Sequence, residues 1–194
     1  MPTTQTSALY CTWTYRQSLP PGLRSQLRDL DHFVRLLCSS AATNLFLVAP
    51  YLSSAGLEAL RAPIATSAQR GAWIRLVTGN LDHRNRANRR ALATLVEGSE
   101  GAIVRKQLRI LTATDKLPAL IHAKIILADG KQGYLGSANL SQSALDRNFE
   151  LGVALQPAQV RSLHSLLSFF EAQGLIKDCT EDTWARQGTR GQGG

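Results

Sequence analysis

The sequence has few cysteines and no long apolar run, and each shortage excludes a class of protein. Its cysteines, Cys11, Cys38 and Cys179, are odd in number and form no CxxC pair. A zinc finger or a disulfide framework is therefore not expected, and the chain fits a reducing cytosol. A membrane-spanning helix needs roughly 18 or more consecutive apolar residues, and the sequence has no such run. Residues 1–18 lack the basic and apolar regions of a secretory signal, so we expect a cytoplasmic protein without a membrane partner.

The composition is that of a globular protein with an excess of basic residues. Of the 194 residues, 44% are hydrophobic and 19% are charged, which is typical of a folded chain. The length fits a single domain, which we expect over residues 7–185, followed by a Gly-rich flexible tail over 186–194. The 22 Lys and Arg against 14 Asp and Glu give a net charge of +8. This balance favours a polyanionic partner.

The basic residues are concentrated in the middle of the chain. Between Arg70 and Arg109, nine basic residues stand against three acidic ones. The densest part falls in a predicted helix, where it could neutralise several phosphates of a nucleic acid. The alternative is a solvated basic face that binds nothing. The predicted nucleic-acid-binding residues are Arg84, Arg86, Arg89 and Arg90.

Strand and helix patterns alternate along the chain. Short apolar runs predict strands over 7–15, 44–49, 72–78, 120–127, 132–135 and 149–155, and two short strands within 102–111. Helices are predicted over 23–39, 53–69, 84–97 and 157–173, with a break or kink at Pro63 and a polar helical turn over 140–145. This alternation predicts an α/β fold in which a mixed β-sheet is flanked by helices.

A lysine among apolar residues marks the strand predicted over 120–127. His122 and Lys124 would share one face of this strand, and apolar residues would occupy the other. A lysine in such surroundings is costly unless it meets an anion. The alternative is a polar stripe on an exposed edge strand.

A second polar group follows the returning strand of the predicted hairpin. Gly136-Ser137-Ala138-Asn139 stands where that strand ends, so Ser137 and Asn139 are expected beside His122 and Lys124. A nucleophile, a cation and several neutral donors suit phosphoryl chemistry without a metal. Taken alone, the Gly-Ser-Ala-Asn segment could also be a turn with a helix cap.

Together these residues resemble the signature of the phospholipase D superfamily. His122-Ala-Lys124, four residues, Asp129, six residues and Gly136-Ser137-Ala-Asn139 match HxKx4Dx6GSxN at every defined position. Glu150, in Asn148-Phe149-Glu150, matches the acidic residue that follows the motif in the superfamily. The resemblance implies a phospholipase D-like layered fold and phosphodiester cleavage through a phosphohistidine. In this chemistry one histidine attacks phosphorus, while a second protonates the leaving oxygen and later activates water.

The resemblance also implies a homodimer, because the superfamily uses two motifs and this chain has one. His32, His83 and His164 lack the rest of the motif. A second copy of the chain would supply the second His122, as equivalent residues meet on a two-fold axis.

The resemblance further assigns a role to each matched residue. Lys124 and Asn139 would bind the non-bridging phosphate oxygens, and Ser137 would donate to the phosphate or tune the lysine. Glu150 would hold the other ring nitrogen of His122. Asp129 and Gly136 are treated as structural positions, and Asp129 is expected to orient the hairpin. No metal or other cofactor is expected.

The motif indicates the reaction and leaves the substrate open. The arginine cluster, the lack of a predicted membrane anchor and the short single-motif architecture favour a nuclease acting on DNA or RNA. One alternative is a nucleic-acid-binding accessory subunit with little turnover, acting with other proteins of a bacterial antiphage system such as DISARM. Another is a phospholipase D-type lipid hydrolase. Trp13, Trp73 and Trp184 could stack on bases, although core burial is the expectation for Trp13 and Trp73.

Overall fold

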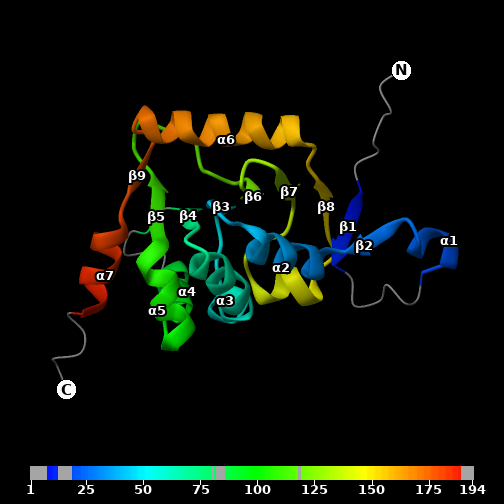
Figure 1. The fold of residues 1–194 in the computed structure, drawn as a ribbon, viewed down its shortest axis with the longest axis horizontal. Helices are drawn as coiled ribbons and strands as arrows, with labels where there is room; N and C mark the ends of the chain where they lie inside the picture. Colours follow the sequence, from blue (N-terminus) through cyan, green and yellow to red (C-terminus); the bar gives the residue numbers. More distant parts are fainter. Residues whose placement is uncertain (1–7, 13–18, 80, 82–85, 118, 189–194) are drawn as a thin grey trace.

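A mixed sheet of nine strands, counted over the described residues, forms the middle layer of the protein (Figure 1). The structure, a computed structural model of the 194-residue chain, describes residues 8–12, 19–79, 81, 86–117 and 119–188. The strands are β1 (Leu9–Thr12), β2 (Leu27–Asp29), β3 (Asn44–Ala49), β4 (Trp73–Thr78), β5 (Leu108–Ala113), β6 (Lys124–Ala128), β7 (Gln132–Gly136), β8 (Glu150–Ala154) and β9 (Ile176–Asp178). Their order in the sheet is β2-β1-β8-β7-β6-β3-β4-β5-β9.

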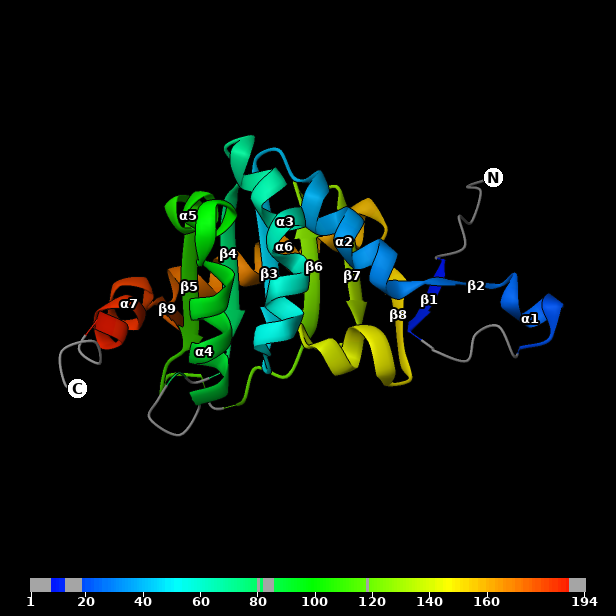
Figure 2. The ribbon, with the colours of Figure 1, turned by 90° about the horizontal axis from the view of Figure 1, so that it is seen from below.

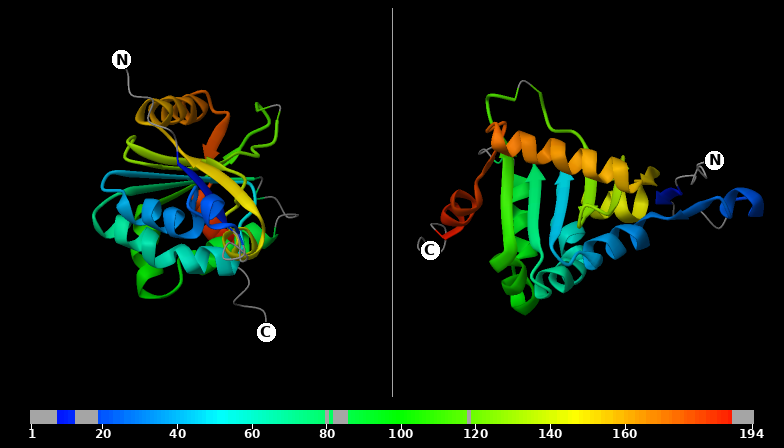
Figure 3. Two further views of the ribbon diagram at one scale, coloured as in Figure 1. Left: turned by 90° about the vertical axis from the view of Figure 1, so that its right-hand side faces the viewer. Right: turned by 45° about the horizontal axis from the view of Figure 1, so that its top comes forward.

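Helices cover both faces of this sheet. They are α1 (Pro21–Arg24), α2 (Leu30–Ser40), α3 (Ser54–Gln69), α4 (Arg86–Leu95), α5 (Gly98–Gln107), the π-helix η2 (Ser143–Arg147), α6 (Pro157–Ala172) and α7 (Thr180–Gly188). Figure 2 shows α2, α3 and α4 on one face, and Figure 3 shows α6 crossing the strands on the other. The predicted α/β fold, a mixed sheet flanked by helices, is confirmed. None of the helices in the described ranges combines the length and apolarity that crossing a bilayer requires.

The alternation of side chains along β3 divides the core into two parts. Leu45 and Leu47 pack with the helices α2 and α3, whereas Phe46 and Val48 belong to the apolar cluster that includes Val160 of α6. Both faces of a strand in the middle of a covered sheet are buried, which explains its continuous apolar sequence.

The strand ends that carry the motif lie together along one edge of the sheet. This edge is formed by the ends of the strands and is not an outer strand. β3, β4 and β5 are parallel, β6 and β8 run antiparallel to their neighbours, and β7 returns in the direction of β3. The carboxyl ends of β3, β4, β5 and β7 therefore meet the amino ends of β6 and β8. Lys124, Gly136 and Glu150, which begin or end these strands, are brought to this edge.

The predicted helix over 23–39 is wrong at its start. The segment contains the short helix α1, then β2, and only then α2. Leu27 pairs with Leu9 of β1 in a parallel register, and Asp29 caps α2 by accepting a hydrogen bond from the His32 amide at 3.0 Å. The predicted strand over 7–15 is present as β1, while residues 13–15, with Trp13, lie outside the described residues.

Of the two strands predicted within 102–111, only one is present, as β5 from Leu108, because the rest of this segment belongs to the helix α5. Val104 is fully buried in the core below the sheet. β4 and β5 are parallel, so the chain must cross back between them, and a helical crossover is the usual solution. The expected burial of Trp73 is contradicted as well: it begins β4 at the opposite edge of the sheet and is 52% exposed.

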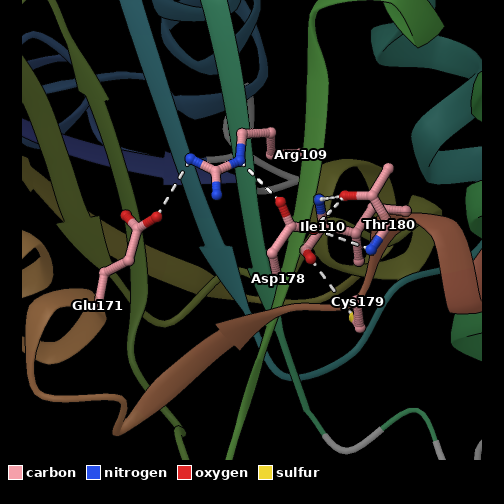
Figure 4. Close-up of polar contacts among 6 residues, drawn as sticks. All are labelled: Arg109, Ile110, Glu171, Asp178, Cys179 and Thr180. Atoms are coloured by element: carbon pink, nitrogen blue, oxygen red, sulfur yellow. Dashed lines mark hydrogen bonds and ion pairs between the residues drawn. The ribbon is translucent and has the colours of Figure 1, made fainter.

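The C-terminal segment adds β9 and α7, which the sequence did not predict. Arg109 of β5 pairs with Asp178 at 2.8 Å and with Glu171 of α6 at 3.2 Å (Figure 4). The Cys179 amide donates to the Ile110 carbonyl at 2.8 Å, which continues the contact with β5 (Figure 4). α7 extends to Gly188, into the segment predicted to be a tail, and residues 189–194 lie outside the described residues.

Candidate active site

His122 and Lys124 are in direct contact where β6 begins. Lys124 is the first residue of the strand and is 7% exposed, whereas His122 precedes the strand and is exposed. The Lys124 ammonium donates to the His122 carbonyl oxygen at 2.8 Å. Its Nζ also lies 3.1 Å from Nδ1 and 3.4 Å from Nε2 of the imidazole. A buried cation therefore touches an accessible imidazole.

The strand predicted over 120–127 begins later than expected. Lys124 pairs with Gly136, the last residue of β7, and Ile125 pairs with Val48 near the end of β3. Both neighbours end at this level, so the backbone before Lys124 has no strand with which to pair. The shared strand face expected for His122 and Lys124 does not exist, and the side chains meet by direct contact instead.

The Lys124 ammonium is buried without a bound carboxylate. Desolvation lowers the pKa of Lys124, and the nearby charge of Glu150 opposes this effect without cancelling it. Among the described residues, no Asp or Glu forms an ion pair with Lys124. Its positive charge is therefore left for an anionic ligand.

Ser137 and Glu150 form a second pair at the same edge. The Ser137 hydroxyl donates a short hydrogen bond to Glu150 Oε2 and accepts one from the Leu151 amide at 3.1 Å. Asn148 Nδ2 donates to the other Glu150 oxygen at 3.3 Å. Within the described residues, Glu150 does not bond His122, which corrects the expected contact. The reason is the strand order: β7 lies between β6 and β8, so Ser137 is the nearer partner.

Gly136 lets the motif strand pack against a buried tyrosine. A Cβ on Gly136 or on Gly152 of β8 would overlap the ring of Tyr134. The Tyr134 hydroxyl accepts a hydrogen bond from the Ala138 amide at 3.3 Å, and burial raises the pKa of Tyr134 to about 12. The two glycines thus leave room for a ring that supports the backbone after β7.

Asp129 holds the hairpin end of β6 against the loop before β3. Its carboxylate accepts hydrogen bonds of 2.8–2.9 Å from the amides of Ala42, Thr43 and Asn44 and from the Thr43 hydroxyl. Burial alone would raise the pKa of Asp129, but these bonds lower it to about 2. The residue lies at the opposite end of β6 from Lys124, so its contacts are structural.

Asn139 is held between two anchored residues. The Ala138 amide bonds Tyr134, and the Leu140 carbonyl accepts from the Ser53 amide at 3.2 Å. Asn139 Oδ1 is buried and has no hydrogen-bond partner in the described part of the chain. A polar atom in this situation is unusual, and it lies in the segment predicted to bind phosphate.

The predicted basic helix is present as α4, and it begins after the carboxyl end of β4. Arg86 and Arg90 are exposed, and Arg89 is half-buried. Arg84 lies outside the described residues. Figure 2 shows that α4 begins near the ends of β3, β4 and β7, the same edge of the sheet that carries the motif.

Two residues of this region were missed by the sequence reasoning. Tyr51 lies just after β3, with its ring centroid 6.4 Å from that of His122 in an edge-to-face arrangement. Asn88 of α4 is 1% exposed and hydrogen-bonds the backbone on both sides of Tyr51. The only local signal was an aromatic residue directly after a buried strand and a proline, which is too common to select a site.

Metal-ligating side chains do not gather in the described residues. No group of three or more His, Cys, Asp or Glu is placed to hold a metal ion there. The candidate site is therefore built from an imidazole, an ammonium, a hydroxyl, a carboxylate and an amide.

Comparison with known proteins places the chain in one family. The model of the family described as cardiolipin synthase, PLD-like domain, matches residues 35–171. The chain belongs to this phospholipase D-like family. The matched range contains the whole motif, Glu150 and α4, and the predicted superfamily resemblance is confirmed. No curated protein matches the chain in sequence.

Three solved structures share the fold. Nuc from Salmonella typhimurium, described as a phospholipase D family member, is similar with a TM-score of 0.59 at 17% identity, covering 89% of this chain and 98% of that one. NucT from Helicobacter pylori has a TM-score of 0.56 at 15% identity, covering 83% and 92%. Phosphatidylserine synthase from Haemophilus influenzae has a TM-score of 0.52 at 16% identity, covering 78% and 37%. Identities this low show a common fold.

Proposed function

We propose that the chain is a metal-independent phosphodiester hydrolase that cleaves nucleic acid at a site completed by a second copy of itself. The observation that carries the proposal is the buried Lys124 ammonium in contact with the exposed His122 imidazole. A cation that is desolvated and has no bound carboxylate among the described residues favours an anion at the imidazole. A phosphodiester is an anion whose phosphorus an imidazole nitrogen can attack.

The proposed reaction has two steps. A His122 nitrogen attacks phosphorus and forms a P–N bond while the P–O bond to the leaving oxygen breaks. The same histidine of a second copy gives its proton to that oxygen. Water then attacks phosphorus, loses a proton to the second histidine and displaces His122. Lys124 donates to the phosphate oxygens as they gain charge, in place of its bonds to His122.

Ser137, Glu150 and Asn139 complete the proposed phosphate site. The Ser137–Glu150 bond fixes the polar groups at the end of β7. Asn139 is held by its anchored neighbours and offers its side-chain amide as a neutral donor.

Exposed apolar residues beside the motif support the proposed dimer. Leu120, two residues before His122, is 87% exposed, and Phe149, directly before Glu150, is 61% exposed. Large apolar side chains exposed close to motif residues in the sequence are candidates for a contact surface. A second copy docked there would bring a second His122 to the phosphate.

The arginines of α4 support a nucleic acid as the substrate. Arg86 and Arg90 are exposed on a helix that begins at the motif edge. A polynucleotide carries further phosphates at regular intervals, so it can bind these arginines and His122 together. A small diester could not.

A phospholipid is the second candidate substrate, favoured by the names of two similar proteins. The family description names cardiolipin synthase, and one structural neighbour is a phosphatidylserine synthase. The exposed Leu120 could then contact acyl chains.

The test is an activity assay in excess EDTA with labelled single- and double-stranded DNA, RNA and a fluorescent phosphatidylcholine. We expect cleavage of nucleic acid, and loss of at least about 1,000-fold in the His122→Ala variant. Cleavage of phosphatidylcholine alone would favour the lipid enzyme. Binding of nucleic acid without turnover would favour an accessory subunit of a defence complex. A strict requirement for Mg²⁺ would overturn the metal-independent mechanism.

A further inference from the structure

Tyr51 is an exposed aromatic side chain on a fixed piece of backbone. It follows β3 by two residues, and its side chain is 59% exposed although Pro50 and Leu52 on either side are buried. Leu52 also forms a parallel bridge with Leu140, directly after Asn139. The ring is thus displayed toward solvent beside the motif and is not part of the core.

A buried asparagine fixes the backbone on both sides of Tyr51. Asn88 Nδ2 donates to the Pro50 carbonyl at 2.8 Å, and Asn88 Oδ1 accepts from the Leu52 amide at 2.9 Å. Asn88 Nδ2 also donates to Thr78 Oγ1 at 2.8 Å. Buried polar networks whose members are all paired are rigid. The backbone of Tyr51 is therefore held in register with the ends of both β3 and β4.

The same asparagine connects Tyr51 to the basic helix. Asn88 belongs to α4, and the exposed Arg86 and Arg90 lie two residues before and after it. The backbone that carries Tyr51 is therefore held in place against the helix that carries the two arginines. Single-stranded nucleic acid is bound by this combination, in which cations hold the backbone and aromatic rings stack on bases.

The contact between Tyr51 and His122 leaves the tyrosine ring free. The ring planes make an angle of 82° at a centroid distance of 6.4 Å, which is a loose edge-to-face contact. His122 is already bonded by Lys124 through its ring and its carbonyl. Orienting His122 therefore does not require Tyr51, and most of the tyrosine remains available to a ligand.

We propose that Tyr51 is a substrate-binding residue that stacks on the nucleobase beside the scissile phosphate. The inference rests on the proposed nuclease function and makes it more specific. A ring next to the attacked phosphorus reaches only a base that is unpaired, so the site selects single-stranded or locally opened nucleic acid. Base identity matters little, because every base offers a flat face.

The experiment compares two single strands that differ only in their bases. One is a labelled thymidine oligonucleotide, and the other carries abasic tetrahydrofuran residues in its central block. For the parent protein in EDTA, we expect kcat/KM for cleavage in the central block to be about tenfold higher for the thymidine strand than for the abasic strand. One stacked base stabilises a complex by about this factor. Tyr51→Ala should lose this advantage and cleave both strands equally, whereas Tyr51→Phe should keep it.

A matched control removes an exposed aromatic elsewhere. Trp73, 52% exposed at the opposite edge of the sheet, is similar in exposure to Tyr51, and Trp73→Ala should cleave both strands as the parent does. Two results would overturn stacking. Either Tyr51→Ala retains the preference for bases, or it slows cleavage of both strands equally, which would mean that the ring only positions His122.

A binding measurement separates this inference from the proposed function. The anisotropy of the two labelled strands is followed with His122→Ala protein, with and without the Tyr51→Ala change. Stacking predicts about tenfold tighter binding of the thymidine strand, abolished by Tyr51→Ala. If the thymidine strand binds more tightly but the parent cleaves neither strand, the stacking proposal stands and the proposed nuclease function is rejected. Cleavage by the parent with equal binding of both strands would reject stacking alone.

Discussion

Lys124 Nζ lies 3.1 Å from His122 Nδ1 and 2.8 Å from the His122 carbonyl oxygen. One buried ammonium thus contacts both the ring and the backbone of the proposed nucleophile. The contact exists because β6 begins at Lys124, which frees the preceding backbone to turn the imidazole back over the lysine. The cation that would bind phosphate is already in place beside the group that would attack it.

Replacing Lys124 by methionine should separate activity from stability. Lys124→Met keeps an unbranched side chain and removes the buried charge. The pKa of Lys124 is lowered in the folded state, so folding disfavours its charged form and the buried ammonium destabilises the protein. This destabilisation is present at neutral pH and declines as the pH rises through the folded-state pKa. We expect phosphodiesterase activity to fall at least about 100-fold while the melting temperature at pH 7 is unchanged or higher.

The control for this change is Lys131→Met, because Lys131 is exposed in the turn after β6. It should alter neither quantity. A large decrease in melting temperature in Lys124→Met alone would contradict the view that the buried ammonium destabilises the folded protein.

Asp129→Asn should destabilise the protein in a pH-dependent way. The pKa of Asp129 is lowered from 3.8 to about 2, so its stabilisation is present above about pH 4 and is lost as the pH falls through about 2. At pH 7 we expect a loss of about 1–2 kcal/mol in the free energy of unfolding, the usual effect of weakening bonds to a charged acceptor. Urea unfolding should show the difference from the parent shrinking between pH 5 and pH 2.5, values chosen about the cited pKa range. A difference that is constant with pH would argue against the carboxylate charge as the cause.

Removing two arginines of α4 should weaken nucleic-acid binding in a salt-dependent way. In the Arg86→Ala/Arg90→Ala variant, the slope of log affinity against log salt on single-stranded DNA should fall by about 1.4 units, if each arginine contacts one phosphate. The matched control is Arg105→Ala/Lys106→Ala, which removes two exposed charges from the last turn of α5. Equal slopes in the parent and the α4 variant would make this surface a solvated face without a ligand.

Adding a methyl group at Gly152 should destabilise the fold. Its Cβ would overlap the ring of Tyr134, which is 1% exposed. Gly152→Ala is expected to lower the free energy of unfolding by about 1–3 kcal/mol, as overpacking does. Gly22→Ala, where nothing lies within 4 Å of the added Cβ, should have little effect. Chemical denaturation of the two variants measures the contrast.

A charge at Leu120 should break the proposed dimer. Light scattering of the parent at micromolar concentration should give twice the chain mass of 21.1 kDa. Leu120→Glu should give the single-chain mass and lose activity, because a buried carboxylate without a partner is costly. Leu36→Glu, on α2 and 51% exposed, serves as the control. A parent protein that stays monomeric and fully active on dilution would rule out the shared site.

The sequence by itself determined the family and the broad fold. The spacing of His122, Lys124 and Asp129 is a local property of the chain, so the family could be recognised without a structure. The run over 44–49 is apolar after Asn44, and it predicted β3 with its bounds. The basic helix was predicted for a similar reason, since its charges and apolar residues alternate with helical spacing.

Only the tertiary structure decided how the site is connected. Glu150 bonds Ser137 rather than His122 because β7 lies between their strands, and no local pattern records the order of strands. Tyr51 acquired its place from Asn88, 37 positions further along the chain and on another element. Part of α5 was predicted as a strand because its short apolar run fits both the strand period and the helix period. The segment is a helix because β4 and β5 are parallel and need a crossover between them. Local sequence encodes which groups can react, whereas contacts between distant segments set which of them touch.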